Sequence, residues 1–161
     1  MAKIVQAELW DLPPPPRLVV VTTNSVVNNR GVLIMERGSA GDAVELDPEI
    51  QAEVTAEIHR QRPEIKLDGT QDYGFLIVRP TPRGFGVLQA KRHWQDVSAW
   101  ETISLALTQL HAWATKHPDV QIRCSAPGLG CGRIGRGVPI PRERIIAACE
   151  KLPDTVTFCF R

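Results

Sequence analysis

The chain has no excess of charge of either sign and no long apolar segment. It has 19 Lys and Arg residues against 18 Asp and Glu residues, so its formal net charge is +1. This balance gives no support to a broad DNA-binding face or a membrane-surface helix, because both need clustered positive charge. No apolar stretch approaches the length of a bilayer crossing, and the N-terminal segment lacks the apolar core and cleavage site of a signal peptide. We therefore expect a cytoplasmic protein with no membrane partner.

Cysteine is scarce, and its spacing fits no known zinc pattern. The four cysteines, Cys124, Cys131, Cys149 and Cys159, form no C-x-x-C pair. Three of them lie in or beside apolar runs, where a free thiol packs as a small hydrophobic group. We predict no metal, no disulfide and no cofactor. At 161 residues the chain can bury a core without them, and we expect a monomer with one domain over residues 1–161.

Apolar patterning predicts several strands and three helices. Two β-branched runs predict strands at 3–10 and 17–24, separated by four prolines that lack the N–H donor of a strand ladder. Two more runs, around the turn TPRG, predict a hairpin. Apolar residues three or four apart predict the helices. The hairpin strands are 73–80 and 84–90, the helices are 47–60, 97–116 and 141–151, and two later strands are 120–126 and 155–160.

The order of these elements predicts an α/β fold. Strands pair as hairpins early in the chain and alternate with helices late, which favours a mixed sheet with helices on both faces. We therefore predict a three-layer α/β/α sandwich. Residues 22–43 combine asparagines, glycines and an apolar patch without clean helical period, so we expect a long loop that lines a site.

The stretch APGLGCGRIGRG, residues 126–137, holds five glycines between a predicted buried strand and a predicted helix. Open α/β sheets bind ligands at such a place. Glycines let the backbone approach a ligand, and successive N–H groups near a helix N-terminus form an anion cradle. A diphosphate fits this description. A plain glycine-rich connection fits it as well, since the Walker and Rossmann spacings are both absent.

Polar and aromatic residues follow two other predicted strands. Asn24 ends the second strand, and QAKRHW places Lys91, Arg92, His93 and Trp94 after the fourth. With these in view, the segments ELWDL, VVVTTNSV, MERGSA, AKRHW and PGLGCGRIGRG resemble, in this order, the motifs of macrodomains, a family that binds ADP-ribose. AKRHW and PGLGCG are similar to the branch that includes the terminal ADP-ribose protein glycohydrolase and the antitoxin that removes ADP-ribose from DNA.

The resemblance implies a set of ligand-binding residues. Asp11 matches the residue that bonds the adenine amino group, although a carboxylate there can also cap the turn before the prolines. Asn24 matches an asparagine that touches the distal ribose, although it can also close an Asx turn at the strand end. The remaining matches are Gly38, Ser39 and Ala40 in a first ligand loop, and Gly128, Leu129, Gly130, Cys131, Gly132 and Arg133 in a diphosphate loop.

The resemblance also implies a catalytic lysine. Lys91 matches a lysine that attacks the anomeric carbon of the distal ribose and forms a transient Schiff-base-type adduct. Such an amine must be deprotonated, which desolvation or a neighbouring cation such as Arg92 favours. The alternative is a solvated lysine that steers the anionic ligand. His93 and Trp94 are expected to be scaffold residues.

Two departures from the pattern bear on catalysis. Gly132 is followed by Arg133 and Ile134, where the resembled glycohydrolase has an aspartate that partners its lysine. Glu36 stands where the family commonly has glycine, and it either compensates as a second catalytic residue or faces solvent. Arg133 and Arg136 are expected to reach phosphate oxygens.

The resemblance therefore implies that the protein binds ADP-ribose and removes mono-ADP-ribose from Glu or Asp side chains of proteins, with Lys91 as nucleophile or electrostatic catalyst. Three alternatives stay open. The protein could be a reader module without chemistry, a hydrolase of ADP-ribosylated nucleic acid, or a phosphatase acting on ADP-ribose 1″-phosphate. The first alternative is favoured by the missing aspartate, and hydrolysis is favoured by the presence of Lys91.

Overall fold

The computed structural model describes residues 1–61 and 72–161, without the side chains of residues 130 and 131. In this part of the chain, six strands form one sheet in the order β1-β6-β5-β2-β4-β3. The β3–β4 pair is antiparallel, and the other neighbouring strands are parallel. The strands are β1 (Lys3–Gln6), β2 (Arg17–Thr23), β3 (Phe75–Arg79), β4 (Arg83–Gln89), β5 (Gln121–Ser125) and β6 (Val156–Phe160).

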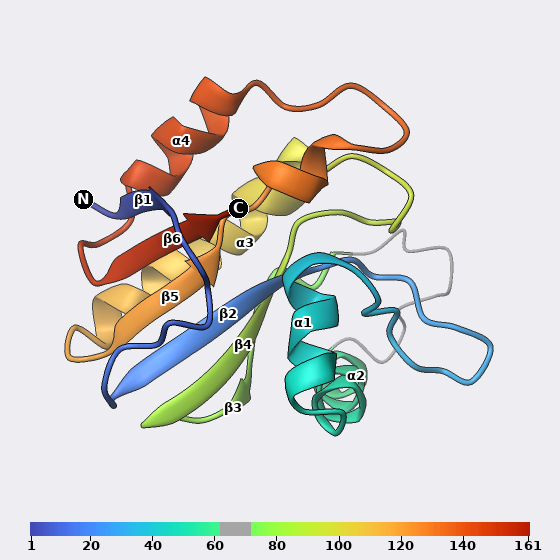
Figure 1. Cartoon of the computed structure of the whole chain (residues 1–161), viewed down its shortest axis with the longest axis horizontal. Helices are drawn as coiled ribbons and strands as arrows, with labels where there is room; N and C mark the ends of the chain where they lie inside the picture. Colours follow the sequence, from blue (N-terminus) through green and yellow to red (C-terminus); the bar gives the residue numbers. More distant parts are fainter. Residues whose placement is uncertain (62–71) are drawn as a thin grey trace.

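Helices cover both faces of the sheet (Figure 1). Two of them pack on one face and two on the other, and a short 3-10 helix, η1 (Gly130–Arg133), follows β5. This arrangement confirms the predicted three-layer α/β/α sandwich. The helices are α1 (Gly38–Leu46) and α2 (Ile50–Gln61) on the first face, and α3 (Trp100–Lys116) and α4 (Arg142–Glu150) on the second.

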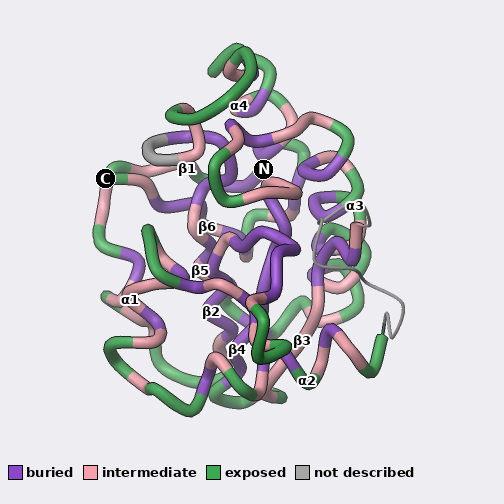
Figure 2. Tube along the Cα trace, turned by 90° about the vertical axis from the view of Figure 1, so that its right-hand side faces the viewer, coloured by how far each residue is buried: buried purple, intermediate pink, exposed green. Residues whose placement is uncertain are grey.

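Strand β2 lies in the middle of the sheet and is buried on both faces. Leu18 and Val20 belong to the core under α3 and α4, whereas Val19 and Val21 belong to the core under α1 and α2. The alternation follows from the two-residue period of a strand, and burial on both faces explains the unbroken apolar run in the sequence. Figure 2 shows the central strands buried and the outer turns of the helices exposed.

The strands early in the chain pair differently from the prediction. The hairpin of β3 and β4 is confirmed, but β1 and β2 do not pair with each other. Strand β1 pairs in parallel with β6 at the edge of the sheet. The segment between β1 and β2 is too long for a tight turn, and its Leu9 is buried in the core under α1 and α2. This segment crosses the sheet and returns the chain to the start of a parallel strand (Figure 1).

Helix α1 is absent from the prediction, which treated residues 22–43 as one loop. The helix begins at Gly38 and buries Ala40 and Ala43 against the sheet. Its start lacks the usual signals, because Arg37 at the N-cap makes no side-chain capping bond and the first turn has no acidic residue. Packing of Ala40 and Ala43 against the sheet therefore stabilises a helix that the local sequence does not predict.

The cysteines of the described residues are buried free thiols. Burial raises the pKa of the Cys149 thiol to about 12, so it stays neutral and packs as a small apolar group. Residues 1–61 and 72–161 contain no group of three or more His, Cys, Asp or Glu side chains that could hold a metal ion. No helix in those ranges has the length and apolar character that a bilayer crossing requires.

One arginine links β3 to α2 and gives a pH-dependent prediction. Arg79 contacts Asp47 through Nη1 and Glu53 through Nε, each at 2.7 Å, and these hydrogen bonds hold the pKa of both carboxyl groups below its usual value. A depressed pKa stabilises the fold above the unfolded-state pKa, and this stabilisation is lost as the pH falls through the folded-state pKa. Arg79→Gln should therefore lower the urea midpoint at neutral pH and lose this effect near about pH 2, where both carboxyl groups are protonated. An equal loss at both pH values would assign the role of Arg79 to packing.

Candidate functional site

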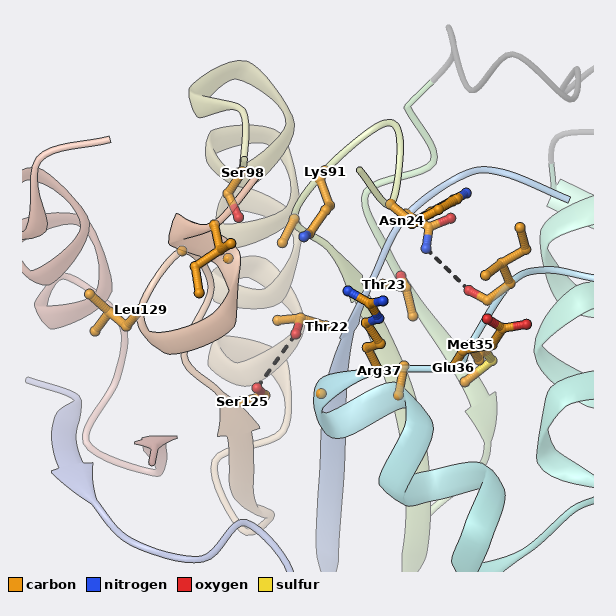
Figure 3. A pocket seen from close by; sticks show the side chains of 18 of the residues that line it. Thr22, Thr23, Asn24, Met35, Glu36, Arg37, Lys91, Ser98, Ser125 and Leu129 are labelled. Atoms are coloured by element: carbon orange, nitrogen blue, oxygen red, sulfur yellow. Dashed lines mark hydrogen bonds between the residues drawn. The ribbon is translucent and has the colours of Figure 1, made fainter. Parts of the chain in front are cut away.

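A cavity of about 200 Å³ opens where β2, β4 and β5 end. One wall is formed by the start of α1 and the segment before it, and the other by the turn after β5 (Figure 3). Strands β2 and β5 are neighbours, but the chain leaves β2 for α1 on one face and leaves β5 for α4 on the other. The cavity therefore lies at a topological switch point, where open α/β sheets bind ligands.

Hydroxyl groups hold the start of α1 against the ends of β2 and β5. The backbone N–H of Thr22 donates to Ser39 Oγ at 3.1 Å, and Thr22 Oγ1 lies 3.5 Å from Ser125 Oγ. Thr22 and Ser125 line the cavity, and so do Gly38 and Ala40 of the predicted first ligand loop. Gly38 has φ +60°, in the left-handed region that favours glycine. Ser39 itself acts as the tie between α1 and β2.

Two cationic side chains face the cavity. Lys91 follows β4, and Arg37 precedes α1, and Figure 3 shows both projecting toward the centre of the site from different walls. Within the described part of the chain, neither side chain forms an ion pair or a hydrogen bond. Their charges are therefore available to an anionic ligand. Arg37 is absent from the sequence prediction, although its place beside Gly38 in MERGSA was a usable signal.

The backbone of Lys91 is fixed by a buried side chain. Gln89 is fully buried, and its Nε2 donates to the Lys91 carbonyl oxygen at 3.3 Å and to Asp72 Oδ1 at 3.2 Å. Its Oε1 accepts from the Tyr73 backbone N–H at 2.8 Å. Arg92 pairs with Asp72 at 3.0 Å, so the positive charge expected beside Lys91 already has a partner. This pairing also raises the pKa of the Arg92 guanidinium.

Asn24 lines the cavity and also performs the alternative role given to it. Its Oδ1 accepts from the Val26 N–H at 2.8 Å, which closes an Asx turn, and its Nδ2 donates to the Ile34 carbonyl at 3.1 Å. The buried Tyr73 hydroxyl donates to the Asn24 carbonyl, and burial raises the pKa of this phenol. The second hydrogen of Asn24 Nδ2 has no acceptor among residues 1–61 and 72–161, so it is open to a ligand.

The glycine-rich turn after β5 packs closely on two helices. Gly128, Leu129 and Gly132 line the cavity, while Gly130 and Cys131 lie in η1, and the Cys131 side chain is outside the described part of the chain. Gly128 has φ +71°, and a Cβ there would lie 2.6 Å from Ile145 Cδ1. The glycines therefore serve the packing of the turn as well as the cavity.

The two arginines of this turn contact protein atoms. Arg133 Nη1 donates to the Ile140 carbonyl at 2.7 Å, and Arg136 Nε donates to Asp96 Oδ1 at 2.8 Å. Neither residue lines the cavity, and their expected contact with phosphate oxygens stays a prediction. Ile134 does line it and is 79% exposed.

The remaining residues singled out in the sequence differ in whether they line the cavity. Glu36 is exposed on the cavity wall and pairs with no cation among the described residues. Asp11 is exposed and does not line the cavity. Trp94 was expected as scaffold, but it lines the cavity with 39% of its surface exposed and stacks on His93.

Comparisons with known proteins identify the fold. No family model and no curated protein sequence matches the chain. Among solved structures, the macrodomain of Thermus aquaticus DarG is similar at 20% identity and a TM-score of 0.66 over 100% of this chain and 98% of that one. The macrodomain of Mycobacterium tuberculosis DarG is similar at 19% identity and a TM-score of 0.65 over 99% and 96%.

A third solved structure, Thermosipho africanus DarTG in complex with ADP-ribose, is similar at 17% identity and a TM-score of 0.65. The match covers 90% of this chain and 38% of that one. These three likenesses extend over 90% or more of this chain at TM-scores of 0.65 to 0.66. The chain has the macrodomain fold.

Proposed function

We propose that the protein binds ADP-ribose in the cavity at the ends of β2, β4 and β5. The observation that carries the proposal is a pair of cations, Lys91 and Arg37, that have no partner among the described residues and face a cavity at the switch point of a macrodomain fold. A diphosphate carries negative charge, so the positive charges of Lys91 and Arg37 attract it and the N–H groups of the glycine-rich turn can donate to its oxygens. A structurally similar protein, T. africanus DarTG, was solved with ADP-ribose.

The size of the cavity limits how much of this ligand it encloses. Its volume of about 200 Å³ is below the range of about 300 to 1,000 Å³ typical of sites for drug-sized ligands. We place the diphosphate and the distal ribose inside and the adenosine along the outer edge of the sheet. Strands β1 and β6 are parallel, so their carboxyl ends lie on the same side of the sheet. Asp11, in the loop after β1, therefore stays our candidate for the contact with adenine.

We propose further that the protein hydrolyses mono-ADP-ribose esters of Glu or Asp side chains. Water supplies the oxygen that replaces the carboxylate on C1″ of the ribose, and the products are ADP-ribose, the free carboxylate and one proton. Lys91 lies on the cavity wall and is held by Gln89, which favours a fixed position at the scissile bond. It acts either as the nucleophile that forms the transient adduct or as the charge that stabilises the leaving carboxylate.

Two observations support second candidates. Lys91 has no carboxylate partner among the described residues, which favours a reader that binds without releasing. Trp94 offers an exposed aromatic face on the cavity wall, which suits stacking on a nucleobase. A release assay with a glutamate-linked ADP-ribosylated protein and with ADP-ribosylated DNA separates these functions. Binding of ADP-ribose in calorimetry with no release from either substrate would identify a reader.

The charge of Arg37 gives a direct prediction for binding. Arg37→Glu should weaken ADP-ribose binding by roughly 10-fold or more, because one ion-assisted contact contributes on the order of 1.5 to 3 kcal/mol. The loss should shrink as salt is added, since the Arg37 side chain is exposed and dissolved ions screen its charge. Calorimetry at two salt concentrations measures it. Arg30→Glu makes the same charge change on the exposed loop before α1, outside the cavity wall, and an equal loss in that variant would show that Arg37 acts only through net charge.

A further inference from the structure

A buried hydroxyl on the cavity wall lacks a partner. Ser98 is 3% exposed and lines the cavity, and its Oγ forms no hydrogen bond within the described part of the chain. Buried hydroxyls in folded proteins are nearly always hydrogen-bonded, and an unmade bond is unfavourable. Among the residues that the structure describes, two other buried polar side-chain atoms lack a hydrogen-bond partner, Trp10 Nε1 and Thr155 Oγ1, and neither residue lines this cavity.

The position of Ser98 is fixed by its neighbours. Its backbone N–H donates to the Gly132 carbonyl at 2.9 Å, and the N–H groups of Val97 and Ala99 donate to the carbonyls of Arg136 and Ala90. These bonds tie the segment before α3 to the glycine-rich turn and to the end of β4. With the backbone held in this way, the Ser98 hydroxyl can change its direction only by rotation of its own side chain.

Gly132 leaves room for this hydroxyl. A Cβ on residue 132 would lie 2.6 Å from Ser98 Oγ, closer than a Cβ atom and a non-bonded oxygen approach. A glycine at this position therefore keeps the hydroxyl at the junction between the glycine-rich turn and the wall that carries Lys91 (Figure 3). The junction is where the proposed function places the diphosphate.

We infer that Ser98 is a ligand contact whose hydroxyl donates to a diphosphate oxygen, an inference that rests on the proposed function. The phosphate oxygen is an acceptor without a hydrogen of its own, so it satisfies the donor that the free protein leaves unpaired. The anionic acceptor also makes the hydrogen bond stronger than a neutral one. Binding of the diphosphate thus gives the Ser98 hydroxyl the hydrogen-bond acceptor that it lacks among the described residues.

The test compares Ser98→Ala with Thr155→Val, which removes the other unpartnered hydroxyl just before β6, away from the cavity. We expect Ser98→Ala to raise the Kd for ADP-ribose and for ADP by about 3- to 10-fold, while its thermal midpoint stays equal or rises. Thr155→Val should change neither Kd. Calorimetry and thermal unfolding of the full chain give both readouts.

Each other outcome has a separate meaning. No ADP-ribose binding by the parent protein would overturn the proposed function itself. Binding by the parent with an unchanged Kd in Ser98→Ala would overturn the contact alone. A loss for ADP-ribose with none for ADP would move the contact to the distal ribose and overturn the diphosphate assignment. Equal losses in both variants would assign the effect to the fold and overturn the contact as well.

Discussion

Lys91→Ala should reduce the release of ADP-ribose from a glutamate-linked substrate by on the order of 100-fold or more, with a much smaller loss of ADP-ribose binding. A positioned nucleophile or charge acts mainly in the transition state, so its removal lowers kcat rather than raising Kd. Single-turnover release and calorimetry with the same preparation measure the two effects. Lys116→Ala at the end of α3 is the matched control, because it removes the same charge away from the cavity.

The two roles open to Lys91 predict different results for a second variant. Lys91→Arg keeps the positive charge but lacks an amine that can form a Schiff base. If Lys91 is the nucleophile, this variant should be as inactive as Lys91→Ala, and borohydride should trap ADP-ribose on Lys91 of the parent. Substantial activity of Lys91→Arg with no trapped adduct would assign an electrostatic role. Equal rates for the parent and Lys91→Ala would remove Lys91 from the mechanism.

The sequence predicts most elements of the fold because local periodicity specifies them. The three- and four-residue spacing of Ile103, Leu107 and Leu110 predicts α3, and burial of these side chains against the sheet confirms it. The unbroken apolar run of β2 likewise predicts a buried strand. Such signals depend on the residue types within one element and need no knowledge of its neighbours.

Long-range pairing was the part that local signals could not supply. The parallel pairing of β1 with β6 joins the two ends of the chain, and no residue near β1 specifies that partner. Helix α1 forms because Ala40 and Ala43 pack on the sheet, in the absence of a capping side chain. In both cases the decisive contact is with residues distant in sequence.

The residues of the candidate site also divide into those that local motifs predict and those that only distant contacts reveal. Residues within recognisable motifs, such as Lys91 and Gly128, were predicted near the ends of strands and do line the cavity. Ser98 is absent from the sequence prediction, because its hydroxyl is distinguished by having no hydrogen-bond partner among the described residues, which only three-dimensional neighbours reveal. Arg37 is absent as well, although its place beside Gly38 offered a sequence signal. For Arg133, the motif predicts a phosphate contact, and the structure adds a hydrogen bond from its side chain to the Ile140 carbonyl that the motif does not indicate.

Gln89→Leu should destabilise the protein by about 2 to 4 kcal/mol, because it removes the hydrogen bonds of a fully buried amide and leaves the buried Tyr73 N–H unpaired. The buried Tyr73 N–H loses its acceptor, and Asp72 and the Lys91 carbonyl each lose a donor. Urea unfolding measures the change. Gln121→Leu on the exposed start of β5 is the control and should stay within about 0.5 kcal/mol of the parent.

The same substitution tests whether the Gln89 network positions Lys91. At a temperature where Gln89→Leu remains folded, we expect the rate of release to fall while the Kd for ADP-ribose changes little, because Gln89 does not line the cavity. Gln109→Leu provides a variant of comparable kind, since Gln109 Oε1 accepts from the Phe75 N–H at 2.7 Å at the start of β3. A loss of release in Gln89→Leu that Gln109→Leu does not share indicates positioning of Lys91, because general loss of stability would slow both variants.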